Sequence, residues 1–107
     1  MKASATLLAA TAALALGMAG QAQAADAEAL AKSSGCLACH TVDKKLVGPS
    51  YKEIADKYRK DKNAEATLIK KVKEGGKGNW GDIPMPPNAH VKDPDIKTLV
   101  VWVLSIK

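Results

Sequence analysis

The sequence has few large aromatic side chains. Its 107 residues include no phenylalanine, and aromatic residues make up only 4% of the chain: Tyr51, Tyr58, Trp80 and Trp102. A chain of this length forms one small domain, and the core of such a domain is marginal. Domains of this size commonly need a disulfide, a metal or another covalent link. The composition therefore predicts that more than ordinary side-chain packing holds this domain together.

Long apolar runs and internal repeats are also missing. Outside the N-terminus, no stretch is apolar for the roughly 18 residues that a membrane-spanning helix needs, which excludes a protein with several membrane spans. No segment repeats at a fixed period, so the chain is not a repeat array. Acidic residues are in the minority, because 16 basic and 11 acidic residues give a formal net charge of +5 at pH 7. This surplus favours acidic partners.

The first 24 residues have the pattern of an export signal. Lys2 provides a positive start, an alanine- and leucine-rich segment follows, and Ala22-Gln23-Ala24 matches the small-x-small pattern of a cleavage site. Cleavage there leaves residues 25–107 as the domain and predicts a periplasmic location. Since Lys2 is the only charged residue of the leader, the remaining domain carries a net charge of +4. An uncleaved membrane anchor is the alternative, but the apolar run is short and diluted by alanine.

Four short helices are predicted in residues 25–107 from capping residues and apolar spacing. Asp26 is the candidate N-cap of the first helix, which ends before Gly35 and leads directly into a cysteine motif. The second helix opens with a capping box formed by Ser50 and Glu53.

The third and fourth helices have equally clear ends. The third follows Asn63 and stops at Gly75, where a left-handed residue costs least. The fourth takes Asp93 as its cap and Pro94 as its first helical residue. Between them lie residues 75–92, a loop rich in glycine and proline. A loop of this length is more often functional than idle.

Residues 36–40 form a CxxCH motif, which is the attachment signature of a c-type haem. Two thiols at this spacing lie on one side of a helical turn and can add to the two vinyl groups of one haem. The next residue can then present its imidazole to the iron. A thioredoxin-type dithiol is the alternative, but no βαβ pattern surrounds the motif. Zinc is disfavoured because there is no second cysteine pair.

The second protein ligand of the iron has two candidates. Without the leader, the chain contains one methionine, Met85, and one histidine besides His40, namely His90. Met85 lies between prolines in the polar loop, which we expect to be held extended there, and not on a helical stripe where a methionine fills the core. His90 lies five residues further on and is expected to be a solvent-exposed side chain. The pattern therefore favours Met85.

The segments GCLACH, LVGPSYKEIADKY, NWGDIPMPPN and LVVWVLSIK together resemble the small bacterial class I cytochromes c of the cytochrome c-551/c-552 type. The resemblance extends over nearly all of residues 25–107. It implies an all-α fold in which four short helices surround one covalently bound haem. It also implies cofactor-binding roles for eight residues: Cys36, Cys39, His40, Met85, Pro49, Trp80, Asn88 and Lys71.

In this resemblance Cys36 and Cys39 correspond to the thioether sites, His40 to the proximal ligand and Met85 to the distal ligand. The carbonyl of the residue corresponding to Pro49 accepts the ring N–H of the proximal histidine, which orients the imidazole.

The remaining roles concern the edge of the cofactor and the loop. Trp80 resembles the tryptophan that donates to a haem propionate, and Asn88 the asparagine near the methionine sulfur. Lys71 stands where the family often has arginine, and pairs with a propionate only as a point charge. The stretch at residues 89–94 is one residue longer than in some members, so the loop after Met85 is expected to differ.

The expected function is electron transport rather than catalysis. With His40 and Met85 both bound, the iron has no free position for a substrate. The resemblance implies a monomer that shuttles electrons in the periplasm, with only peripheral contact to membrane complexes. A bc-type complex is the expected donor; a nitrite reductase, a terminal oxidase or a peroxidase is the expected acceptor. The alternatives are a haem peroxidase or gas sensor, in which Met85 dissociates, and a dithiol oxidoreductase.

Six lysines are expected either to ring the exposed haem edge and attract acidic partners or only to solvate the surface: Lys44, Lys45, Lys70, Lys71, Lys73 and Lys77. Nucleic acid is not an expected partner, because Asp61 interrupts the basic run at residues 58–62 and the chain is expected to be exported.

Overall fold

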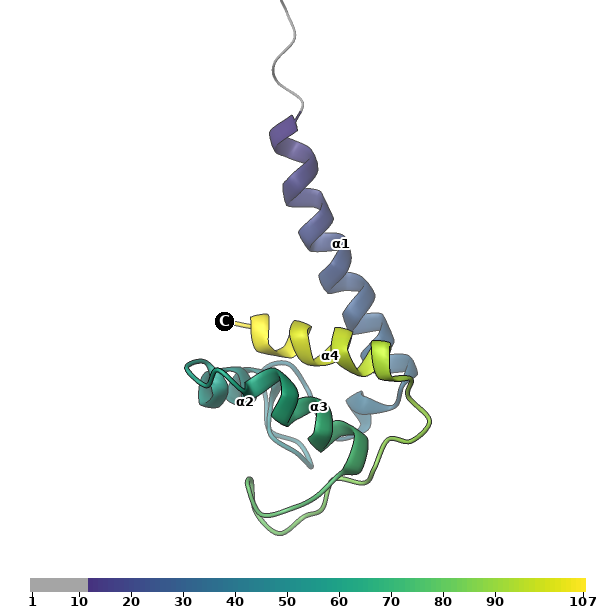
Figure 1. Ribbon diagram of the computed structural model, residues 1–107, viewed down its shortest axis with the longest axis vertical. Coiled ribbons are helices and arrows are strands. Elements are labelled where there is room, and N and C mark those ends of the chain that lie inside the picture. Colours follow the sequence, from purple (N-terminus) through teal and green to yellow (C-terminus); the bar gives the residue numbers. More distant parts are fainter. Residues whose placement is uncertain (1–11) are drawn as a thin grey trace, which may run out of the picture.

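The computed structural model describes residues 12–107, with side chains described from residue 23. This part of the chain contains four α-helices and one turn of 3-10 helix and no extended strand (Figure 1). The elements are α1 (Ala12–Ser33), η1 (Cys36–Ala38), α2 (Tyr51–Tyr58), α3 (Ala64–Glu74) and α4 (Asp93–Ser105). The all-α class expected from the sequence is therefore confirmed.

Helix α4 is the centre of the domain, because α1, α2 and α3 all pack against it. One apolar stripe of α4 faces inward, and its residues Ile96, Leu99, Val100 and Val103 are all buried. Burying one such side chain stabilises a fold by roughly 1.5–3 kcal/mol. Ala31 of α1 is fully buried against this stripe. The small side chain allows the two helices to approach each other closely.

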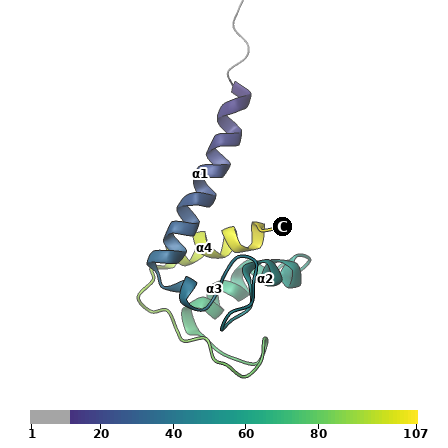
Figure 2. The ribbon, with the colours of Figure 1, turned by 180° about the vertical axis from the view of Figure 1, so that it is seen from behind.

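Helix α1 differs from the expected first helix. It runs without a break from Ala12 to Ser33, so Asp26 lies inside it and does not cap it. The reason is that the alanine-rich residues before Asp26 have high helix propensity and continue the helix. Residues 1–11 of the expected leader lie outside the described residues. In both views, the N-terminal half of α1 projects away from the other helices (Figures 1 and 2).

Within residues 12–107, no helix is both long and apolar enough to cross a membrane.

Helix α2 begins at the predicted Ser50 cap, and one of the two bonds of the expected capping box is present among the described contacts. The Ser50 hydroxyl accepts a hydrogen bond from the backbone N–H of Glu53 at 3.1 Å. At the start of α3, Asn63 makes no such bond with its side chain. The Asp61 carboxylate instead accepts the backbone N–H of Asn63 at 2.8 Å. The end of α3 is as predicted, since Gly75 has a φ of 74°.

Helix α4 starts one residue earlier than expected. Lys92 occupies the cap position and Pro94 lies in the first turn. Asp93 is therefore the first helical residue, and its carboxylate pairs with the Lys73 ammonium at 3.1 Å. This ion pair joins the end of α3 to the start of α4.

The loop between α3 and α4 folds back on itself. Gly76 and Met85 exchange two backbone hydrogen bonds of 3.0 and 2.8 Å. Beyond this pair, the N–H of Gly78 bonds to the carbonyl of Gly81 at 2.9 Å. Residues 76–85 therefore form a narrow arm. Sequence reasoning did not foresee the pairing of Gly76 with Met85. Gly75 is required at its base, because a Cβ there would collide with the Met85 carbonyl.

Replacing Ser50 with alanine tests the cap of α2. The variant lacks the hydroxyl that accepts the Glu53 N–H. Because Ser50 is buried, we expect this loss to lower the free energy of unfolding by about 1 kcal/mol. Chemical denaturation of the cofactor-loaded protein measures it. The control is Ser33→Ala, at an exposed hydroxyl that bonds only to the carbonyl of Leu30. Equal losses in both variants would contradict the assignment.

Candidate functional site

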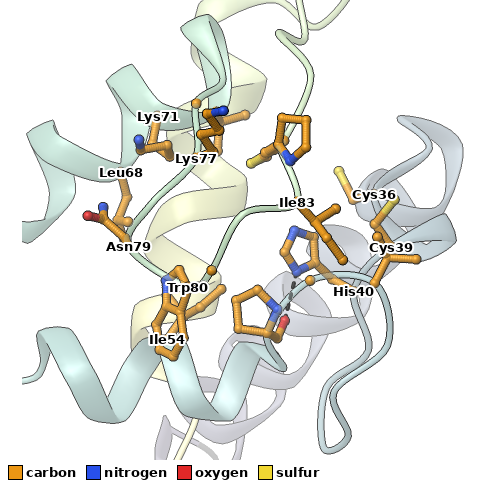
Figure 3. Close-up of a pocket in the computed structure, with 18 of the residues that line it drawn as sticks. Cys36, Cys39, His40, Ile54, Leu68, Lys71, Lys77, Asn79, Trp80 and Ile83 are labelled. Carbon is orange, nitrogen blue, oxygen red and sulfur yellow. Dashed lines mark hydrogen bonds between the residues drawn. The ribbon is translucent and has the colours of Figure 1, made fainter.

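A cavity of about 350 Å³ lies beneath the arm, between η1, α2, α3 and α4. Its volume is within the range of small-molecule and cofactor sites, about 300–1,000 Å³. Leu68, Leu99, Val100 and Val103 form part of its apolar wall. Figure 3 shows that polar and sulfur-bearing side chains reach it from several elements. Among the side chains of α1 that the structure describes, residues 23–33, none lines the cavity.

Two thiols lie at one side of the cavity. Cys36 and Cys39 are unpaired and half-buried, and both line the cavity next to His40 (Figure 3). The turn of η1 produces this arrangement, because the N–H groups of Cys39 and His40 both bond to the Cys36 carbonyl. Burial raises the pKa of the Cys36 thiol above its usual value. This thiol is therefore protonated at neutral pH.

The His40 ring is buried and held in one orientation. Its Nδ1 lies 2.7 Å from the carbonyl oxygen of Pro49, and its ring stacks on Tyr51 at 5.3 Å between centroids. Because a carbonyl only accepts hydrogen bonds, Nδ1 carries the proton and donates. The Nε2 lone pair is then available for a metal.

Two further residues support the imidazole, and sequence reasoning missed them both as site residues. Gly48 lies directly against the ring, since a Cβ there would be 2.6 Å from the His40 Cε1. Tyr51 packs on the ring face, with its own ring edge-on to Trp102 at 5.4 Å. The only signal for Gly48 was its place before Pro49 and the Ser50 cap. Tyr51 carried the apolar spacing of α2, which does not distinguish a core residue from a site residue.

Met85 and His90 occupy different places. Met85 is half-buried and lines the cavity together with His40. His90 is exposed and does not line the cavity, and its Nε2 lies 3.1 Å from the Ser34 carbonyl oxygen at the end of α1. The structure thus brings a thioether and an imidazole to one cavity and gives His90 a separate contact.

Asn88 fastens the segment that follows the arm to α3. Its side-chain amide donates to the carbonyls of Val72 at 3.0 Å and Pro86 at 3.3 Å. Both amide hydrogens are used in this way, and Asn88 is not among the residues that line the cavity. A contact between Asn88 and the Met85 sulfur stays a prediction.

Trp80 and Lys71 reach the cavity from the arm and from α3 (Figure 3). The Trp80 ring is 41% exposed, and the Lys57 ammonium lies 4.6 Å from its centroid. Lys71 is half-buried, with its ammonium close to Gly76 at the base of the arm.

The rim of the cavity combines apolar and basic side chains. Val47, Trp80 and Ile83 are exposed there, and Ile83 is 66% exposed. Of the six lysines expected at a haem edge, three line the cavity and three do not. The lining lysines are Lys45, Lys71 and Lys77. Lys73 pairs with Asp93 instead, while Lys44 and Lys70 lie elsewhere on the surface.

These residues fit a haem. Two thiols at one edge suit covalent attachment, an imidazole and a thioether suit the two axial positions of iron, and apolar walls suit the porphyrin. Among the described residues, no cluster of three or more His, Cys, Asp or Glu side chains could hold a bare metal ion.

Known proteins provide a close match. The family model described as Cytochrome c matches residues 20–107. The chain is 52% identical over 96 residues to cytochrome c-552 of Nitrosomonas europaea, covering 90% of this chain and 91% of that protein. It is 56% identical over 77 residues to cytochrome c-551 of Allochromatium vinosum, covering 72% and 82%. The crystal structure of wild-type Nitrosomonas europaea cytochrome c552 gives a TM-score of 0.73 at 49% identity, covering 75% of this chain and 99% of that one.

The matches cover most of the domain and not the cysteine motif alone. They confirm both the resemblance to the c-551/c-552 type and the class I cytochrome c fold expected from it. The chain supplies the two cysteines that one covalently attached haem requires. The protein therefore belongs to the cytochrome c family, and its cofactor is covalently bound haem c.

Proposed function

We propose that the protein is a periplasmic electron carrier whose haem iron is bound by His40 and Met85. The observation that carries this proposal is that both side chains line one cavity together with the thiols of Cys36 and Cys39. When bound, the haem supplies a one-electron couple between Fe(III) and Fe(II). The protein contributes the ligands, the apolar surroundings and the surface through which partners approach.

Each residue has a defined part in this proposal. Cys36 and Cys39 would hold the cofactor at the η1 turn through thioether links, each formed by net addition of the S–H group across one vinyl group. Pro49 holds the His40 imidazole through Nδ1 and increases its basicity. Met85 provides a weak donor that favours Fe(II), and the apolar walls act in the same direction. The reduction potential is therefore expected to be positive.

The same ligand pair disfavours catalysis, because neither axial position is left for a substrate. The decisive experiment is the absorption spectrum in both oxidation states, with carbon monoxide added to the reduced protein. A carrier gives a six-coordinate low-spin spectrum in both states and no change with carbon monoxide. Rapid carbon monoxide binding would instead indicate the alternative, a peroxidase or gas sensor with a labile Met85.

The intact mass of the exported protein tests both processing and haem attachment. We expect a chain that begins at about Ala25, because cleavage follows Ala24, and that carries the mass of one haem. Acidic acetone should not extract the haem, since the links at Cys36 and Cys39 are covalent. The Cys36→Ala, Cys39→Ala double variant is the control, and should lose haem to the same extraction. A wild-type mass equal to that of the bare chain would reject attachment.

Replacement of Met85 by alanine tests the distal ligand. The variant should lose the long-wavelength absorption band that sulfur gives with ferric iron. Its potential should fall by on the order of 0.1 V, because the thioether favours Fe(II). The matched control is His90→Ala, which should leave both nearly unchanged since His90 does not line the cavity and its ring bonds to the Ser34 carbonyl. The reverse pattern would indicate two histidine ligands.

The proposed partners are redox proteins that meet the rim of the cavity. A bc-type complex is the proposed donor, and a nitrite reductase, a terminal oxidase or a peroxidase the proposed acceptor. Val47 and Ile83 offer an apolar centre, and Lys45, Lys71 and Lys77 surround it with positive charge. Such a rim raises the rate of encounter more than it raises affinity, which suits a complex that must form and part quickly.

Charge reversal tests this rim. Lys77→Glu should lower the bimolecular electron-transfer rate with an acidic partner by roughly 3- to 10-fold at low salt. Lys97→Glu is the control, because it changes the net charge equally but lies in a separate groove between α1 and α4. Stopped-flow kinetics at two salt concentrations measures the rates. The difference should shrink near 0.15 M salt, where the Debye length is about 8 Å. Equal effects of the two reversals would show that only net charge matters.

A further inference from the structure

The outer part of the arm has few contacts that hold it in place. Residues 77–84 extend beyond the Gly76–Met85 pair, and their own backbone bond joins Gly78 to Gly81. Both glycines have positive φ values, 106° and 115°, so this part of the backbone is conformationally permissive. Trp80 lies between them and is 41% exposed. Burial alone therefore does not fix its ring.

Lys57 is the side chain that joins this part of the arm to α2. Its ammonium lies 4.6 Å from the Trp80 ring centroid and 3.4 Å from the carbonyl oxygen of Asn79. The second contact is the only hydrogen bond that links residues 77–84 to the rest of the described chain. The same ammonium lies 5.7 Å from the ring of Tyr58, on its own helix. One cation therefore contacts α2 and the arm at the same time.

We propose that Lys57 is a positioning residue that holds Trp80 and the outer arm at the rim of the cavity. A cation over an aromatic face is attracted by the ring quadrupole even where the pair is exposed. The tether acts at the outer end of the arm, while Asn88 holds its base to α3. The inference rests on the proposed function in one respect, which is that a bound haem lies in the cavity next to the arm.

The choice of Lys57 over its neighbours follows from geometry. Lys52 projects from the same helix and is also exposed, yet its ammonium makes no ion pair, cation–π contact or hydrogen bond within the described part of the chain. Lys71 and Lys77 line the cavity but neither lies over an aromatic ring. A lysine at position 57 is therefore distinguished by its contacts and not by its charge.

Amide hydrogen exchange of the haem-loaded protein tests the proposal. Lys57→Gln removes the charge with little change in helix propensity. It should speed exchange of the Gly78 amide by about two- to fivefold, as expected for the loss of an exposed cation–π contact. Lys57→Arg should restore the slow rate, because a guanidinium also stacks on an indole. Lys52→Gln is the matched control and should change nothing.

A double variant separates this tether from a general loosening of α2. In a Trp80→Leu background, Lys57→Gln should have a smaller effect on Gly78 exchange than in the unmodified protein, because the ring contact is gone and only the bond to the Asn79 carbonyl is left to lose. An unchanged Gly78 rate in Lys57→Gln, an equal change in Lys52→Gln, or an additive effect in the double variant would each overturn the proposal.

The comparison of Lys57→Gln with Lys52→Gln is made in two proteins with the same iron ligands, so it does not depend on which residue binds the iron. Loss of the proposed ligation would be seen in the long-wavelength band of the unmodified protein, whereas failure of the tether would leave that band intact. The two proposals therefore fail separately.

Discussion

The bond between the His40 ring and the Pro49 carbonyl is the constraint on which the rest of the site depends. It selects the tautomer that leaves Nε2 free and fixes the plane of the ring. The bond forms because Gly48 leaves room for the imidazole and because Ser50 starts α2 immediately afterwards. Three consecutive positions, Gly48, Pro49 and Ser50, in this way hold the imidazole in one orientation.

The second constraint is a shortage of large side chains. Leu99, Val100 and Val103 of α4 are buried, and each also lines the cavity. One face of the hydrophobic core is therefore the wall of the cofactor site. A planar, mostly apolar cofactor between α3, α4 and the arm provides the aromatic bulk that a chain without phenylalanine lacks. In this protein the cofactor site and the core are parts of the same packed interior.

Much of this could be predicted from short-range patterns. The Ser50–Glu53 cap, the stop at Gly75 and the apolar stripe of α4 all follow from local preferences, and the structure contains them. The cysteine motif is a covalent requirement that can be recognised in five residues. Met85 was favoured over His90 by its surroundings, and the structure places only Met85 at the cavity.

The features that sequence reasoning missed depend on contacts between distant residues. The Gly76–Met85 pair, the position of Gly48 against the ring and the two amide bonds of Asn88 have no signal at fixed spacing. Asp26 was expected to cap the first helix because cleavage was assumed to precede it, whereas in the described chain the residues before Asp26 belong to the same helix. Asp93 was expected to cap α4, but Lys92 occupies the cap position and Asp93 is the first helical residue. The Asp93 carboxylate pairs with Lys73, a residue 20 positions away that local spacing does not point to.

The place of α4 in the chain has a consequence for how the protein is made. The thiols at Cys36 and Cys39 belong to the first half of the chain, but the wall formed by Leu99, Val100 and Val103 lies within its last ten residues. A chain that is synthesised from its N-terminus therefore contains both attachment points well before it contains the wall of the cavity. The cofactor can therefore be attached before the chain has folded around it. The last residues of the chain then complete the apolar wall that excludes water from the cavity.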